Sequence, residues 1–126
     1  MAGMVTALSG VLLSCDSGPH AGELAFELVS PVGDDRAIMF EVTALEPFTV
    51  EGLTAACTGC QGFWHKPSDT RLKGILIGPL GSGPIGRVSV SDVGDRAAYT
   101  LTLLDVAGPD LELRPAADRS LQFLRR

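Results

Sequence analysis

The sequence predicts an all-β protein, an antiparallel β-sandwich of about eight or nine short strands. Apolar and polar residues alternate with a period of two in many short segments, which is typical of strands with one buried face. Turn-forming residues separate these segments about every 8–15 residues, the spacing found in sandwiches and barrels. No segment has the sustained i, i+3, i+4, i+7 apolar spacing of an amphipathic helix.

Three strands are expected in the first half of the chain. Residues at positions i, i+2 and i+4 of a strand share one face, so each set of three such residues predicts a strand. The sets are Leu24, Phe26 and Leu28; Ile38, Phe40 and Val42; and Phe48, Val50 and Gly52, with Leu53 on the opposite face. The segment 31–35 (PVGDD) is rich in turn formers and separates the first two strands.

The second half continues the same pattern. Its expected strands are a short aromatic one at Phe63-Trp64-His65, one over 71–77, one with Gly86, Val88 and Val90, and one with Tyr99, Leu101 and Leu103. The glycine-rich segment 78–83 (GPLGSG) predicts a loop. Leu111, Leu113 and residues 121–124 close the chain, with at most one helical turn at 116–119.

Several segments resemble small bacterial extracellular domains of the cohesin-like or immunoglobulin-like sandwich kind. They are 22–24 (GEL), 35–40 (DRAIMF), 74–78 (GILIG), 90–93 (VSDV) and 98–101 (AYTL). These are core and turn positions, and none carries a catalytic residue over to this chain. The resemblance implies an adhesion, docking or scaffold role.

An uncharged apolar run, 4–14 (MVTALSGVLLS), lies at the N-terminus. About 20 apolar residues are needed to span a bilayer, so the run predicts the apolar region of a secretory signal peptide. It ends at Leu12-Leu13-Ser14-Cys15, which resembles the lipobox of bacterial lipoproteins. The resemblance implies lipid attachment at Cys15 and a membrane-anchored periplasmic or cell-envelope location. Because no Lys or Arg precedes Cys15, an uncleaved segment that packs against the domain or a partner is the alternative.

The chain therefore divides into a leader with a lipobox-like anchor at 1–15, a linker at 16–21 (DSGPHA) and a sandwich domain at 22–126. A length of 126 residues suits one such domain, and 45% hydrophobic residues suffice for a packed core. The net charge of −5 argues against a nucleic-acid partner, which would require a basic surface. The basic residues Lys66, Arg71 and Lys73 are interpreted as a solvated strand edge.

Cys57 and Cys60 are separated by two residues, and this spacing is compatible with three chemical roles for the pair. A structural disulfide is favoured, because lipidation of Cys15 would leave this pair in an oxidising compartment. A redox dithiol would require a helix N-terminus to stabilise the thiolate, whereas an aromatic strand follows here. A zinc site would use Cys57, Cys60 and His65, with His20 or an aspartate as the fourth ligand.

Four aspartates suggest a possible calcium site. Asp34 and Asp35 lie in one expected turn and Asp92 and Asp95 in another, so a calcium ion would require the two loops to meet. Ordinary turn chemistry is the favoured interpretation, since Asp stabilises turns through local hydrogen bonds, and calcium binding is the alternative.

The best candidate for a contact surface is the run Phe63, Trp64, His65 and Lys66. Adjacent strand residues point to opposite faces, so Phe63 and Trp64 cannot both enter the core of a regular strand. One of these rings should lie outside the core, where large aromatic residues often anchor a partner.

No enzyme is expected, since the sequence has no nucleophile-elbow motif and no obvious catalytic carboxylate pair, and no cofactor is expected either. The sequence instead predicts a non-catalytic, membrane-anchored or membrane-extrinsic docking subunit of a larger envelope complex, such as an energy-transducing one. The alternatives are a carbohydrate-binding module that uses Trp64 and a redox or metal protein that uses Cys57 and Cys60.

Overall fold

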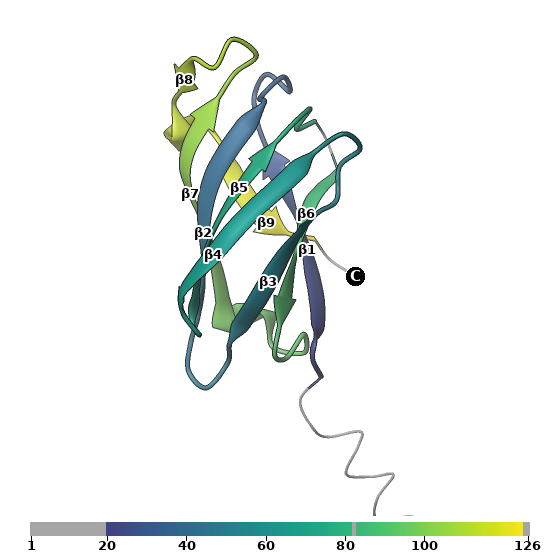
Figure 1. Ribbon diagram of the computed structural model, residues 1–126, viewed down its shortest axis with the longest axis vertical. Coiled ribbons are helices and arrows are strands. Elements are labelled where there is room, and N and C mark those ends of the chain that lie inside the picture. The colour runs from purple at the N-terminus through teal and green to yellow at the C-terminus, as the bar shows by residue number, and fades with distance from the viewer. Residues whose placement is uncertain (1–19, 82, 125–126) are drawn as a thin grey trace, which may run out of the picture.

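The computed structural model describes residues 20–81 and 83–124, which form an antiparallel sandwich of two sheets (Figure 1). Nine strands make up this part of the chain, so the predicted fold class is confirmed. The strands are β1 (Gly22–Val29), β2 (Ala37–Ala44), β3 (Val50–Ala55), β4 (Gln61–Ser68), β5 (Arg71–Ile77), β6 (Pro84–Val90), β7 (Tyr99–Ala107), β8 (Leu113–Arg114) and β9 (Ser120–Phe123). Two short 3-10 turns, η1 (Arg96–Ala98) and η2 (Ala116–Asp118), complete the elements.

The two sheets have the strand orders β3-β6-β1-β9 and β4-β5-β2-β7-β8. Their edges are formed by β3 and β9 in the smaller sheet and by β4 and β8 in the larger one. The C-terminal segment contributes β8 to one sheet and β9 to the other, so the last part of the described chain joins both layers (Figure 1).

The core consists of the inward-facing residues of both sheets, as the period-two pattern predicts. At its centre the rings of Phe26 and Phe40 meet with a centroid separation of 5.2 Å. Phe26 lies opposite Gly86 on the neighbouring strand, and Phe40 lies opposite Gly74. An added Cβ would lie 2.6 Å from the Phe26 ring at Gly86 and 2.8 Å from the Phe40 ring at Gly74. Both positions therefore need glycine because the aromatic rings occupy the space.

The third strand differs from its prediction. It begins at Val50 rather than at Phe48, and a bulge between Val50 and Gly52 changes its phase. A bulge places two residues against one on the partner strand, so the alternation is broken. As a result Leu53, which pairs with the core residue Val88, shares the inward face with Val50, whereas Gly52 pairs with Ser89. Gly52 and Leu53 face opposite sides as predicted, but the prediction that Gly52 lies on the same face as Val50 was wrong. Phe48 precedes the strand and packs edge-on against Tyr99.

Two other boundaries differ from expectation. The aromatic strand extends over Gln61–Ser68, well beyond Phe63-Trp64-His65. Leu111 is exposed in a turn with a φ of 64°, and the strand begins only at Leu113. The predicted leader 1–15, with its lipid-attachment residue Cys15, and linker positions 16–19 lie outside the described residues. Within the part that is described, no helix is long and apolar enough to cross a membrane.

Candidate functional site: an apolar sheet face

The outer face of the four-stranded sheet is an ordinary solvent-facing surface. Glu23 of β1 and Arg87 of β6 form an ion pair at 3.6 Å across the strands. The amide of Gln122 on β9 donates a hydrogen bond to the carboxylate of Glu27 on β1. Polar groups that satisfy one another in this way are typical of a sheet face in contact with water.

The outer face of the five-stranded sheet is different, because apolar side chains lie in a row across its strands. Phe63 on β4 is opposite Ile75 on β5, and Ile75 is opposite Met39 on β2. Phe63 is 53% exposed, Met39 37% and Ile77, at the end of β5, 44%. Leu113 on β8 extends the surface to the far edge. We call these five residues, Met39, Phe63, Ile75, Ile77 and Leu113, the apolar face.

Two adjoining depressions hollow this surface. The larger, of about 410 Å³, is lined by Met39, Phe63 and Ile75, with His65 and Lys73 beside them. The smaller, of about 220 Å³, lies towards β7 and β8 and is lined by Leu113 and Asp105. Both include Met39 and Ile75, so they form one continuous shallow groove. Contiguous exposed apolar surface of this kind commonly marks an interaction site.

The four predicted contact residues all lie on β4, but strand alternation divides them between two faces. Phe63 and His65 pair with Ile75 and Lys73, whose side chains line the outer groove. Trp64 lies on the other side, where its ring packs over β3. The expectation that one of the two adjacent aromatic rings lies outside the core is thus confirmed for Phe63, which is exposed on the outer face.

Trp64 and Lys66 instead close the side of the sandwich between β4 and β3. A Cβ added to Gly52 would lie 3.3 Å from the Trp64 ring, which shows how closely the ring covers β3. The ammonium of Lys66 lies 3.8 Å from Glu51 and 3.7 Å from Asp69. These two residues therefore bridge the two sheets at this edge, although the Trp64 side chain remains partly exposed.

Sequence reasoning missed much of the apolar face. The alternating pattern assigns three of its residues to strands but not to a contact surface: Met39, Ile77 and Leu113. A signal for part of it was present in the unbroken apolar run 75–77 (ILI), since apolar residues on both faces of a strand indicate that both faces are covered.

Cys57 and Cys60 lie at disulfide distance in the loop between β3 and β4, with Cα atoms 5.4 Å apart. His65 follows Cys60 along the extended strand β4, and five residues of strand span about 16 Å. One ion cannot bind atoms so far apart, so the structure does not assemble Cys57, Cys60 and His65, which were considered as an alternative metal site. Among residues 20–81 and 83–124 there is no cluster of three or more metal-ligating side chains.

Removal of this disulfide should have only a modest effect on stability. The bond closes a loop of four residues, and the entropy that such a short loop removes from the unfolded chain amounts to no more than about 2 kcal/mol. We expect the double variant Cys57→Ser, Cys60→Ser to remain folded, with a slightly lower urea midpoint. Circular dichroism during urea titration measures this, and an unfolded variant would contradict it.

The structure also separates the four aspartates that were considered as an alternative calcium site. Asp34 and Asp35 lie in the loop between β1 and β2, and Asp92 and Asp95 lie between β6 and η1, at the opposite end of the sandwich (Figure 1). Asp92 accepts hydrogen bonds from the backbone N–H groups of His20 at 3.3 Å and Gly94 at 2.9 Å. The local turn chemistry that the sequence favoured therefore accounts for Asp92.

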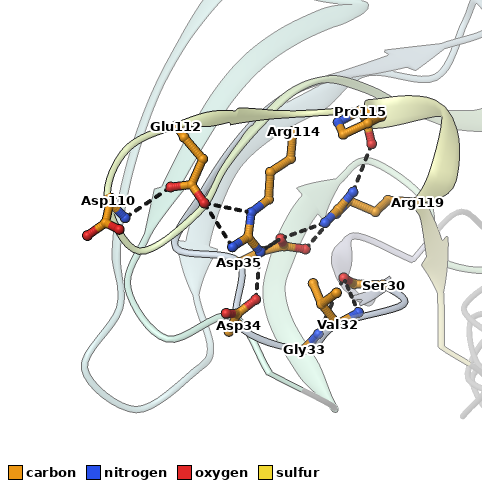
Figure 2. A network of polar contacts seen from close by, with 10 residues as sticks. All are labelled: Ser30, Val32, Gly33, Asp34, Asp35, Asp110, Glu112, Arg114, Pro115 and Arg119. Atoms are coloured by element: carbon orange, nitrogen blue, oxygen red, sulfur yellow. Dashed lines mark hydrogen bonds and ion pairs between the residues drawn. The ribbon is translucent and has the colours of Figure 1, made fainter.

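Asp35 is the one charged residue of the described chain that is fully buried, and two arginines surround it (Figure 2). Arg119 donates two hydrogen bonds, from Nε to Oδ2 at 2.8 Å and from Nη2 to Oδ1 at 3.0 Å. Arg114 donates a third to Oδ1 at 3.0 Å. Such paired geometry is what allows a carboxylate to remain ionised inside a protein. We call these three residues the carboxylate clamp.

The clamp continues outwards to the surface. Arg114 also binds Asp34 at 2.6 Å and Glu112 at 3.0 Å (Figure 2). The hydrogen bond from Arg114 lowers the pKa of Asp34, and the pKa of Glu112 is lowered by a backbone hydrogen bond and by Arg114. Burial acts to raise the pKa of Asp35, but the hydrogen bonds from Arg119, Ser30 and Arg114 outweigh it and hold this pKa below its ordinary value. The network connects the C-terminal segment to the β1–β2 loop and has a structural role.

Because of the carboxylate clamp, we expect the folded protein to lose stability in acid. Because the pKa of Asp35 is lower in the folded than in the unfolded chain, the carboxylate contributes stability above the unfolded pKa of about 3.9, and this is lost as the pH falls through the folded pKa. We expect the free energy of unfolding to fall between about pH 5 and pH 2, and to fall less in an Asp35→Asn variant. Urea titrations across this range measure it, and parallel curves for the two proteins would contradict it.

The fold and this site together define the chain as an antiparallel β-sandwich with one polar and one apolar outer sheet face. No family model, curated protein or solved structure matches the chain. The structure therefore supports the resemblance to cohesin-like or immunoglobulin-like domains only at the level of a two-sheet antiparallel sandwich.

Proposed function

We propose that this chain is a non-catalytic docking subunit, held at a membrane surface, that binds another protein of a larger envelope complex through its apolar face. The observation that carries the proposal is the contrast between the two outer sheet faces. One presents cross-strand polar pairs, and the other presents Phe63, Met39 and Ile77 partly exposed over a shallow groove. Aromatic and Met side chains are enriched in the cores of protein interfaces, which supports a protein partner.

The connection to the proposed anchor supports a fixed orientation at the membrane. His20, the first described residue, is held at one end of the sandwich because its backbone carbonyl accepts a hydrogen bond from Val93 at 2.8 Å. At about 3.6 Å per residue, the chain between a lipidated Cys15 and His20 spans at most about 18 Å. That end then faces the membrane, the carboxylate clamp faces away from it, and the apolar face is turned sideways towards partners in the same membrane.

Purification from the native membrane tests the proposal. We expect the full chain to co-purify with a defined partner at a fixed stoichiometry, and a Phe63→Ser, Ile77→Ser variant to lose that partner. The matched control is Val32→Ser, Leu45→Ser, which removes two exposed apolar residues outside the apolar face and should leave binding intact. Melting temperatures of both variants exclude unfolding as the cause. A chain that purifies alone, or a Phe63→Ser, Ile77→Ser variant that keeps its partner, would contradict docking.

Carbohydrate binding through Trp64 is the alternative proposal. Trp64 is 45% exposed, which leaves part of its ring free to stack on a sugar, although the ring also covers β3. A glycan array that compares the full chain with Trp64→Ala and Phe63→Ala variants tests this alternative. Absence of any bound glycan would remove it.

A further inference from the structure

The charged groups around the apolar face indicate what kind of partner segment fits it. Three basic residues lie on β4 and β5, and two of them form ion pairs: Lys66 with Glu51 and Asp69, and Arg71 with Glu41 at 2.5 Å. Lys73 lines the larger depression. Glu41 lies directly opposite Lys73 on β2, but its carboxylate binds Arg71, and among the described residues no ion pair includes Lys73.

An acidic group occupies the other side of the groove. Asp105 of β7 is directly opposite Met39 and lines the smaller depression, and no ion pair is formed by it within the described chain. The row Phe63, Ile75 and Met39 therefore ends at a carboxylate on β7, while Lys73 lies two residues from Ile75 on β5. Two strand spacings of about 4.8 Å and one two-residue step of about 6.6 Å place the backbones of Lys73 and Asp105 about 12 Å apart.

We propose that the groove binds a segment of the partner protein with apolar side chains between a carboxylate, which pairs with Lys73, and a basic group, which pairs with Asp105. This inference rests on the proposed docking function and specifies the chemistry of the partner. The apolar side chains cover Phe63, Met39 and Ile75, and the two ion pairs set the direction in which the segment crosses the sheet. Complementary charges at an interface mainly provide orientation and specificity, which is the role that this arrangement assigns to them.

Site-specific photo-crosslinking in the native envelope tests the inference with the full chain. The photo-reactive residue p-benzoylphenylalanine replaces Ile77 or Leu113 on the apolar face, or Glu23 on the opposite sheet as the control. We expect Ile77 and Leu113 to crosslink to one partner protein, and Glu23 not to. Mass spectrometry should find an acidic and a basic residue on opposite sides of the apolar residues in the crosslinked peptide.

Charge variants supply a second measurement. We expect Lys73→Glu and Asp105→Lys each to lower the crosslinking yield by about tenfold, and Lys73→Arg to retain it, because reversal of a charge replaces attraction by repulsion. Asp105 is exposed, so its substitution should leave the fold intact, and a melting temperature confirms this for each variant.

The outcomes separate this inference from the docking proposal. A crosslinked partner peptide without flanking charges, or a yield unaffected by Lys73→Glu and Asp105→Lys, overturns the inference and leaves docking in place. Crosslinks from Glu23 alone, a crosslinked dimer of this chain, a crosslinked glycan, or no crosslink at any position overturns both.

Discussion

Replacement of Asp35 by alanine is expected to destabilise the protein by about 3–5 kcal/mol, the cost of removing one partner from a buried ion pair. Arg119 is almost completely buried and donates two of its hydrogen bonds to Asp35, so its charge would remain inside without compensation. This is a large part of the stability of a domain of this size, for which about 5–15 kcal/mol is usual. Urea unfolding at neutral pH, followed by circular dichroism, measures the loss.

Asp34→Ala is the matched control, since Asp34 binds the same Arg114 from an exposed position. We expect little change in the urea midpoint, because exposed ion pairs contribute little to stability. The double variant Asp35→Ala, Arg119→Met should be less destabilised than the sum of its two single variants, since both remove the same interaction. Equal effects of Asp34→Ala and Asp35→Ala, or strict additivity in the double variant, would show that the clamp does not contribute as described.

Gly86→Ala is expected to lower the free energy of unfolding by about 1–3 kcal/mol, the usual cost of overpacking a core. The added Cβ would lie 2.6 Å from the Phe26 ring, and that ring cannot move freely because it packs against Phe40. The entropy that alanine removes from the unfolded chain offsets only part of this, about 0.5–1 kcal/mol. The same urea titration measures the effect.

Gly81→Ala provides the control for this prediction. An added Cβ at Gly81 meets no atom within 4 Å, so the substitution should be neutral or slightly stabilising. A Phe26→Leu background should reduce the cost of Gly86→Ala, because the smaller side chain leaves space for the new methyl group. If Gly86→Ala is as harmless as Gly81→Ala, the contact between Phe26 and position 86 does not limit the packing.

The period-two pattern was sufficient to predict the two-sheet sandwich, because inward residues such as Phe26, Phe40 and Val88 must alternate with outward ones. It failed over which of Gly52 and Leu53 shares the inward face with Val50, since a bulge depends on how β3 meets β6 and leaves no local signal in the composition. It also left the zinc and calcium alternatives open, because residue spacing does not show which loops meet.

The candidate site was only partly predictable for a similar reason. Phe63 was identified because it is adjacent to Trp64 in the sequence. Strand geometry alone places adjacent side chains on opposite faces of a sheet. Met39 and Leu113 join it through pairings between strands that are distant in sequence, and single-sequence alternation does not specify these pairings. The carboxylate clamp was missed because Asp35, Arg114 and Arg119 lie far apart in the chain and look like ordinary turn and terminal residues.

The long sequence separation between Asp35 and the two clamp arginines, 79 and 84 residues, has a consequence for biogenesis. Synthesis on the ribosome proceeds from the N-terminus, so Asp35 emerges long before Arg114 and Arg119 can neutralise it, and β1 emerges long before its neighbour β9. The buried carboxylate of Asp35 therefore has no counter-charge until residues 114–119 have left the ribosomal tunnel, and the native sandwich cannot be completed before then.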